Sequence, residues 1–266
     1  MVRVMGVVNL TPDSFSDGGR FLAPDAALAH ARALVAAGAD ILDLGAESTR
    51  PGATPVSADD EIARLVPLIE AIRAESAVTI SVDTMKSQVA RAAMGAGADI
   101  WNDVTALGFS DESPATAAEL GCGVVLMHMQ GEPRTMQAHP SYDDVVAEVA
   151  AFLNVRAEVA MAAGVARDKI WLDPGIGFGK RLEHNLALLA HMDLLVALGF
   201  PVLLGVSRKR FIAALDPAAE PAEARGPGSL AAALAGVQAG VAALRVHDVA
   251  ETVQALKVWA AISRAR

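Results

Sequence analysis

Eight short apolar runs recur along this chain of 266 residues, and each is followed by a loop and an alanine-rich segment with helical spacing. The runs begin near Val4, Ile41, Thr79, Asp99, Val124, Ile170, Val202 and Leu244. Their spacing of roughly 20 to 45 residues is what a strand and a crossover helix need before the next parallel strand. Eight such units in this length predict an α/β protein with a closed (β/α)8 TIM barrel.

The apolar runs lack the polar alternation of a strand that has one face in water, as the run 202–206 illustrates. Parallel strands that are covered on both faces have this character. The helical segments carry boundary signals as well, and we expect Asp25 to cap a helix over 26–37, with Gly38 ending it. No linker rich in Ser, Gly and Pro divides the chain, so residues 1–266 are predicted to form a single domain.

The charge balance argues against nucleic acid and membranes as partners. Lys and Arg number 22 against 31 Asp and Glu, and the formal net charge of −9 repels nucleic acid and anionic lipid. The longest apolar stretch is interrupted by His191, Asp193 and Gly199, which fits a helix followed by a strand better than a membrane span. No secretory signal pattern opens the chain, and the single Cys122 excludes an intramolecular disulfide. We therefore expect a cytoplasmic protein.

Polar residues follow all eight predicted strands, at the ends where barrels of this kind carry their active sites. Asp83, Asn102 and Asp173 are placed to point inward from their strands. Two carboxylates and an amide match a flat heterocycle whose edge is rich in N–H donors. Buried carboxylates are costly unless they are paired, so we expect a ligand or Lys209 as their partner.

The basic residues gather near the last two strands, where barrels commonly bind phosphate. Arg245 and His247 lie one strand step apart on one face, and Asn9 is expected nearby across the barrel closure. These three residues suit a phosphate or a metal-bound diphosphate.

Several polar residues have a structural explanation beside the functional one. Asp43 is open between a bridge inside the barrel and a role in the site. Asp103 alternates with Asn102 and is expected to face away from the barrel interior, while His128 is interpreted as a hydrogen-bonded core histidine. The glycine-rich run 175–181 lacks the spacing of a Walker A loop, so we interpret it as a tight loop through which the backbone approaches a ligand.

Taken together and in order, these strand ends resemble those of dihydropteroate synthase. The matching segments are residues 5–19, 47–52, 81–84, 101–104, 173–180, 207–209 and 245–248. The first of them and the run Asp-Pro-Gly-Ile-Gly-Phe-Gly-Lys at 173–180 are the most specific signals. The resemblance implies that p-aminobenzoate displaces diphosphate from 6-hydroxymethyl-7,8-dihydropterin diphosphate to form 7,8-dihydropteroate in folate biosynthesis.

The resemblance also assigns roles to individual residues. It implies that Asp83, Asn102, Asp173 and Lys209 hold the pterin and that Asp83, Asp173, Lys209 and Asp17 are catalytic. It places the diphosphate on Asn9, Arg245 and His247, with Asn9 as ligand of a Mg²⁺ cofactor. The p-aminobenzoate pocket, which also takes sulfonamide inhibitors, would comprise Phe15, Ser16, Thr49, Arg50, Pro51, Phe178 and Lys209. A homodimer through barrel helices is a further implication.

One position departs from the family pattern. In many members the lysine of the segment that matches residues 207–209 is followed by a serine, which helps to hold the aminobenzoate carboxylate. In this chain Lys209 is followed by Arg210. That contact then falls to a backbone N–H at the helix start or to the arginine itself.

Two alternatives share the pterin-binding residues. A methyltetrahydrofolate:corrinoid methyltransferase-type barrel would need neither the loop 9–19 nor the pair Arg245 and His247. A noncatalytic pterin-binding homologue would be favoured by loss of Asp173, Lys209 or Arg245, and all three are present.

Overall fold

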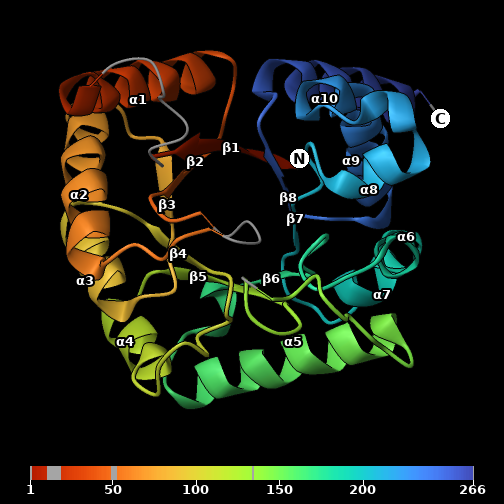
Figure 1. Ribbon diagram of the computed structural model, residues 1–266, viewed down its shortest axis with the longest axis horizontal. Coiled ribbons are helices and arrows are strands. Elements are labelled where there is room, and N and C mark those ends of the chain that lie inside the picture. Colours follow the sequence, from red (N-terminus) through yellow and green to blue (C-terminus); the bar gives the residue numbers. More distant parts are fainter. Residues whose placement is uncertain (1, 11–18, 49–52, 134, 266) are drawn as a thin grey trace.

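Eight parallel strands form one sheet at the centre of the protein (Figure 1). The computed structural model describes residues 2–10, 19–48, 53–133 and 135–265. The strands are β1 Arg3–Asn9, β2 Ile41–Gly45, β3 Thr79–Asp83, β4 Ile100–Asp103, β5 Gly123–Met127, β6 Ile170–Asp173, β7 Leu203–Leu204 and β8 Ala243–Val246. Each begins within one residue of the position predicted from the apolar runs.

The sheet closes on itself. Its order is β6-β5-β4-β3-β2-β1-β8-β7, so β1 pairs with both β2 and β8. The remaining gap is closed by a parallel bridge between Leu172 of β6 and Val202, next to which the Leu172 N–H donates to the Pro201 carbonyl at 2.9 Å. The predicted (β/α)8 barrel is therefore confirmed.

Helices surround the barrel on the outside (Figure 1). They are α1 Gly19–Ala36, α2 Ala58–Glu75, α3 Ser87–Gly95, α4 Ser113–Leu120, α5 Val145–Ala162, α6 Leu182–Ala190, α7 Met192–Val196, α8 Arg210–Leu215, α9 Gly226–Ala239 and α10 Val249–Arg264. Short 3-10 turns occupy Arg167–Lys169, Pro217–Ala219 and Ala222–Arg225.

The expected start of the first helix is wrong. The helix begins at Gly19, so Asp25 lies within α1 and does not cap it. The predicted end is confirmed: α1 ends at Ala36, and Gly38 adopts φ +101°, a left-handed conformation that costs glycine little. An aspartate is a poor guide to a boundary when the residues before it can also form helix, as they do here.

Side-chain alternation divides the apolar residues into two groups. Inside the barrel, at its amino-terminal end, Met5, Ile41, Ile100, Trp171 and Leu203 pack together. The other face of the strands packs against the helices in one continuous core. Apolar side chains fill the barrel at the amino-terminal ends of the strands, and the polar side chains inside the barrel lie at the carboxyl ends.

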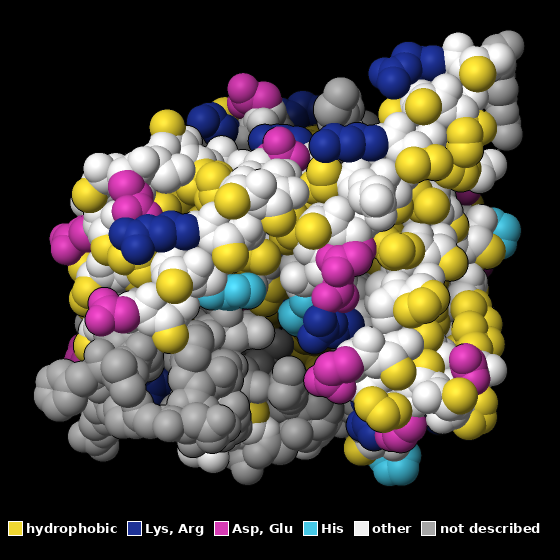
Figure 2. All heavy atoms as spheres, turned by 90° about the horizontal axis from the view of Figure 1, so that it is seen from above, with side chains coloured by type: hydrophobic (Ala, Val, Ile, Leu, Met, Phe, Trp, Pro, Cys, Tyr) yellow, Lys and Arg dark blue, Asp and Glu magenta, His cyan; other side chains and the backbone are white. Residues whose placement is uncertain are grey.

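The surface formed over α1 and α10 carries acidic and basic side chains interspersed with apolar ones (Figure 2). No patch of one sign covers the described part of this face. None of the helices that the structure describes is both long and apolar enough to cross a membrane.

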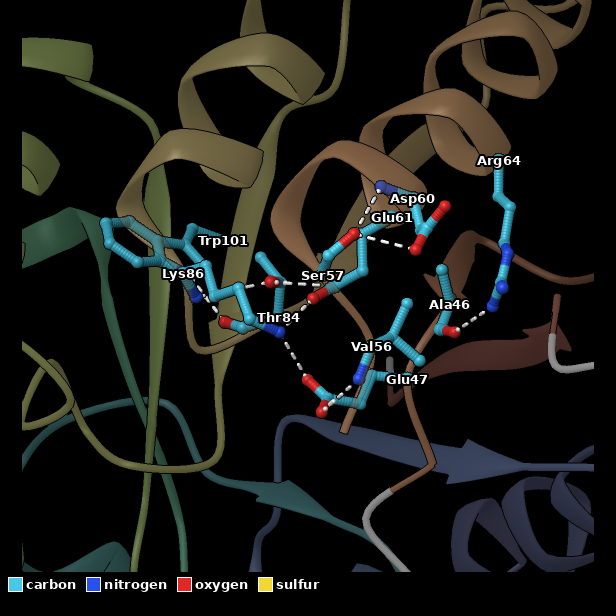
Figure 3. A network of polar contacts seen from close by, with 10 residues as sticks. All are labelled: Ala46, Glu47, Val56, Ser57, Asp60, Glu61, Arg64, Thr84, Lys86 and Trp101. Carbon is cyan, nitrogen blue, oxygen red and sulfur yellow. Dashed lines mark hydrogen bonds and ion pairs between the residues drawn. The ribbon is translucent and has the colours of Figure 1, made fainter. Parts of the chain in front are cut away.

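A buried polar network joins the end of β2, the first turn of α2 and the end of β3 (Figure 3). The Lys86 ammonium donates to Glu47 Oε2 at 2.6 Å and also to Glu61 Oε1. Glu61 is fully buried, and its other oxygen accepts the Thr84 hydroxyl at 3.0 Å. Glu47 Oε1 accepts the N–H of Val56 at 3.1 Å. Lys86, which follows β3, thus binds two acidic groups of the preceding β/α unit, Glu47 after β2 and Glu61 in α2.

The same network reaches the strand ends that carry Asp83 and Asn102. The Trp101 indole N–H donates to the Thr84 carbonyl at 2.8 Å, and the Thr84 N–H donates to the Asn102 carbonyl at 3.1 Å. Thr84 directly follows Asp83, so the backbone of both polar residues is fixed from the outer side of the barrel.

Replacing Lys86 by methionine should destabilise the fold by about 3 kcal/mol, because it leaves Glu61 as a buried carboxylate without its cation. Burial already raises the pKa of Glu61, with Lys86 acting against that shift. The raised pKa makes protonation favour the folded state, so the difference from wild type should be larger at neutral pH than at mildly acidic pH. Urea unfolding at both pH values measures it.

The matched control is Arg32→Met, which breaks an ion pair with Glu75 at the surface. It should cost much less stability than Lys86→Met, because solvent screens this exposed pair. Equal losses in the two variants, or a Lys86→Met loss that does not depend on pH, would contradict this account of the network.

Candidate active site

The inward-facing polar residues converge at the carboxyl end of the barrel. Asp43, Asp83, Asn102, Asp173 and Arg245 come from five different strands and alternate with residues that face the helices. Asp103 faces the other way: its Oδ1 accepts the Thr105 N–H and its Oδ2 the Leu107 N–H, both at 2.8 Å. Its expected structural role is therefore confirmed.

Arg245 joins two of the carboxylates across the barrel. Its Nε donates to Asp43 Oδ2 at 2.6 Å, and its Nη2 donates to Asp83 Oδ2 at 2.9 Å. Asp43 is fully buried and also accepts Asn102 Nδ2, which lies 3.3 Å from each of its oxygens. Asp43 is thus a bridge inside the barrel. The carboxylate of Asp83 has Arg245 as its ion-pair partner, where the sequence suggested a ligand or Lys209.

The carboxylic acids of Asp83 and Asp173 lie in surroundings that disfavour their ionised form. Burial raises the pKa of Asp83, and the neighbouring Arg245 opposes the rise. Burial also raises the pKa of Asp173, against the Gly175 N–H that donates to its Oδ1 at 2.7 Å. Cationic or N–H-rich groups that enter the barrel mouth would stabilise both in the ionised form.

Lys209 lies opposite Asp173, immediately before α8. Its ammonium nitrogen is 4.1 Å from the centroid of the Phe178 ring, a cation–π distance. Burial, followed by repulsion from Arg245, lowers the pKa of Lys209 to about 8, while Asp173 and Asp83 act in the other direction. The site therefore unites Asp173, Phe178 and Lys209, which the sequence predicted for two different substrates.

His247 lies beyond Arg245 at the end of β8. Its Nδ1 is 3.0 Å from the hydroxyl of Ser207, which also accepts the His247 backbone N–H at 3.1 Å. Burial, followed by the nearby Arg245, lowers the pKa of His247 to about 4, so the ring is neutral near neutral pH. Asn9 ends β1 and is half-buried beside Gly45 of β2.

The residue before Lys209 has a strained backbone. Arg208 adopts φ +57°, a region that side chains other than glycine rarely occupy. Its N–H donates to the Ser229 hydroxyl at 2.8 Å, its carbonyl accepts Arg225 Nη1 at 3.0 Å, and its side chain forms an ion pair with Asp248. Such over-determined strain is typical of functional sites, and here it lies directly before Lys209, whose charge acts on Asp173. The residues surrounding Arg208 were missed from sequence, since no local pattern marks a positive φ at arginine.

Several predicted site residues lie outside the described residues. They are Phe15, Ser16 and Asp17 near the first strand and Thr49, Arg50 and Pro51 after the second. Arg210 is described: it is the first residue of α8 and its side chain is exposed.

Within the described residues, no cluster of three or more His, Cys, Asp and Glu side chains could hold a metal ion. Mg²⁺ is often held by one or two protein oxygens together with substrate phosphates and water. The Asn9 amide at the end of β1 can supply one such oxygen.

Residues 5–247 match the family model described as "Pterin binding enzyme". Dihydropteroate synthase of Neisseria meningitidis serogroup C is 49% identical over 263 residues, which are 98% of this chain and 92% of the relative. A structure of Xanthomonas albilineans dihydropteroate synthase with 4-aminobenzoic acid superimposes with a TM-score of 0.93 at 50% identity, over 98% of this chain and 93% of that one. A structure of that species' enzyme with 7,8-dihydropteroate gives a TM-score of 0.89 at 47% identity, with 98% and 94% covered.

Both the extent of the match and the identity are well above what fold similarity alone produces, and the match includes the strand ends that carry the polar site. The chain belongs to the dihydropteroate synthase family of pterin-binding enzymes.

Proposed function

We propose that this chain is a transferase that condenses 6-hydroxymethyl-7,8-dihydropterin diphosphate with p-aminobenzoate, forming 7,8-dihydropteroate and diphosphate. The observation that carries the proposal is the convergence of Asp83, Asn102, Asp173 and Lys209 in a barrel that matches dihydropteroate synthases over almost its whole length. A family member that only bound pterin would not need the phosphate-directed groups of β8 as well.

The pterin fits the inner part of the site. Its guanidine-like edge presents N–H donors to the carboxylates of Asp173 and Asp83, while the Asn102 amide can both donate and accept. Lys209, at the rim, would donate to ring acceptors. Because Arg245 already neutralises Asp43 and shares Asp83, the bound pterin enters a site whose charges are nearly balanced.

The reaction needs stabilisation of charge more than a strong base. An electron-rich pterin can stabilise positive charge on its exocyclic methylene as the C–O bond to diphosphate breaks. The aminobenzoate nitrogen then forms the new C–N bond and releases a proton. Asp83 and Asp173 support the positive charge, and their positioning by backbone and arginine contacts keeps them from relaxing away.

The diphosphate is assigned to Asn9, Arg245 and His247. The neutral imidazole can donate one N–H to a phosphate oxygen, and Arg245 supplies fixed positive charge. The Asn9 amide oxygen would hold Mg²⁺, which would supply positive charge beside the leaving diphosphate.

The p-aminobenzoate is assigned to the rim formed by Phe178 and Lys209, together with Phe15, Ser16, Thr49, Arg50 and Pro51. The Phe178 ring offers an apolar surface for the benzoate ring. Arg210 or the backbone N–H groups at the start of α8 can bind its carboxylate. Sulfonamides, which have the shape of the aminobenzoate, would occupy the same place, and Asp17 is retained as a candidate catalytic residue.

We also propose a cytoplasmic homodimer. Leu186, Leu194 and Leu215 are exposed on α6, α7 and α8, and helices that pair would cover them. Light scattering of the purified protein measures its mass in solution and so decides between monomer and dimer.

A corrinoid methyltransferase-type activity and a purely noncatalytic role lack comparable support.

Lys209→Met should lower kcat/KM for the pterin diphosphate by about 100-fold, because a charged partner of the ring is lost and Asp173 loses one of the cations that offset its burial. Dihydropteroate is measured by chromatography with Mg²⁺ and both substrates. Lys169→Met, at an exposed lysine on the opposite end of β6, is the control and should behave as wild type. Wild-type protein that binds pterin yet forms no dihydropteroate would overturn the proposed reaction.

The activity should fall as the pH rises above about 8, because Lys209 loses its proton there. The lowered pKa means that the ammonium is present below that pH and absent above it. In Lys209→Arg, whose guanidinium keeps its proton, any remaining kcat/KM should lack the alkaline decline. An identical alkaline limb in both proteins would assign it to a different group.

A further inference from the structure

A lysine that the proposed reaction does not use lies buried beneath the site. Lys180 ends the run 173–180, and only 3% of its surface is exposed. Its ammonium nitrogen is 2.9 Å from His128 Nδ1, 3.0 Å from the carbonyls of Gly175 and Phe178, and 3.3 Å from the carbonyl of His128. No salt bridge joins Lys180 to a carboxylate in the part of the chain that the structure describes.

These four acceptors match the chemistry of an ammonium group. Burial lowers the pKa of Lys180 to about 7, while Asp173 opposes the shift. When protonated, the group has three N–H donors and no acceptor, so these three donors serve four acceptors in two main-chain segments. One is the end of β5 at His128 and the other is the connection that follows Asp173. Burial lowers the pKa of His128 to about 3, so its ring is neutral and Nδ1 can accept from Lys180.

The connection 174–179 packs closely against the end of β5. Gly175 has φ +65°, and a Cβ there would lie 1.9 Å from the His128 carbonyl oxygen. At its other end, the Tyr142 hydroxyl donates to the Gly179 carbonyl at 2.7 Å. The Lys180 ammonium fixes the segment between these two points, at Gly175 and at Phe178.

Both fixed points touch residues of the proposed site. The Gly175 N–H donates to Asp173, and the Phe178 ring lies on the Lys209 ammonium. We propose, on the basis of the proposed function, that Lys180 is a positioning residue: its buried ammonium holds the connection 174–179 so that Asp173 and Phe178 meet Lys209 in the geometry that pterin and aminobenzoate require.

Lys180→Met tests this, because it keeps the length of the side chain and removes the donors. Hydrogen exchange of the Gly175, Gly177 and Phe178 amides should accelerate by about tenfold, while the exchange rates of the amides in the eight strands should not change. The number of active sites is measured by calorimetric titration with the pterin diphosphate. The kcat/KM for this substrate, calculated per active site, should fall by about tenfold or more. A merely structural role would lower the thermal midpoint and the number of active sites without changing kcat/KM per site.

Two variants of His128 serve if Lys180→Met does not fold. Asparagine places an oxygen near the position of Nδ1 and should preserve the exchange rates and kcat/KM. Leucine, of similar size but without an acceptor, should shift both in the direction of Lys180→Met.

Unchanged exchange in Lys180→Met, or in His128→Leu where that variant replaces it, would overturn the proposal. Accelerated exchange with full kcat/KM per site would overturn it as well. If wild-type protein makes no dihydropteroate, the proposed reaction fails, whereas the exchange rates still decide whether Lys180 holds the connection.

Discussion

The guanidinium of Arg245 is the group on which the arrangement of the barrel mouth depends. It reaches from β8 across the interior to Asp43 on β2 and Asp83 on β3, and through Asp43 it is linked to Asn102 on β4. Without Arg245, the carboxylates of Asp43 and Asp83 would be buried near one another with only the Asn102 amide as a partner, at a cost of several kcal/mol of stability. Because Arg245 pairs with both carboxylates, it links four strands at the level of the proposed site, and the acceptors are held in position without a ligand.

The opposite side of the mouth is organised by backbone contacts. Asp173 is held by the N–H of Gly175, and Lys209 follows a residue whose left-handed backbone is fixed by Ser229 and Arg225. Lys209 is thereby left with a cation–π contact to Phe178 and with nearby Asp173 to offset repulsion from Arg245. The Lys209 ammonium therefore has N–H donors left for an incoming ligand. Arg245 already donates from Nε and Nη2 to two carboxylates, so only its remaining N–H donors can meet a ligand.

Much of this could be predicted from the sequence, and the remainder has identifiable causes. Periodic apolar runs separated by loops placed all eight strands, and alternation within β4 correctly turned Asp103 outward and Asn102 inward. The partner of Asp83 could not be predicted, because residues 83 and 245 are joined only by barrel closure. The buried ammonium of Lys180 was likewise hidden, since its acceptors are mostly main-chain carbonyls, which leave no mark in a sequence.

In the proposed reaction, the polar barrel mouth binds the pterin ring by its N–H edge. A crystal structure of this protein with 7,8-dihydropteroate tests it most directly. We expect ring nitrogens at hydrogen-bond distance, about 3 Å, from the Asp173 carboxylate and the Asn102 amide, with Lys209 against the ring and Phe178 beside the benzoate. A ligand bound elsewhere on the barrel, or one whose pterin edge contacts neither Asp173 nor Asn102, would contradict it.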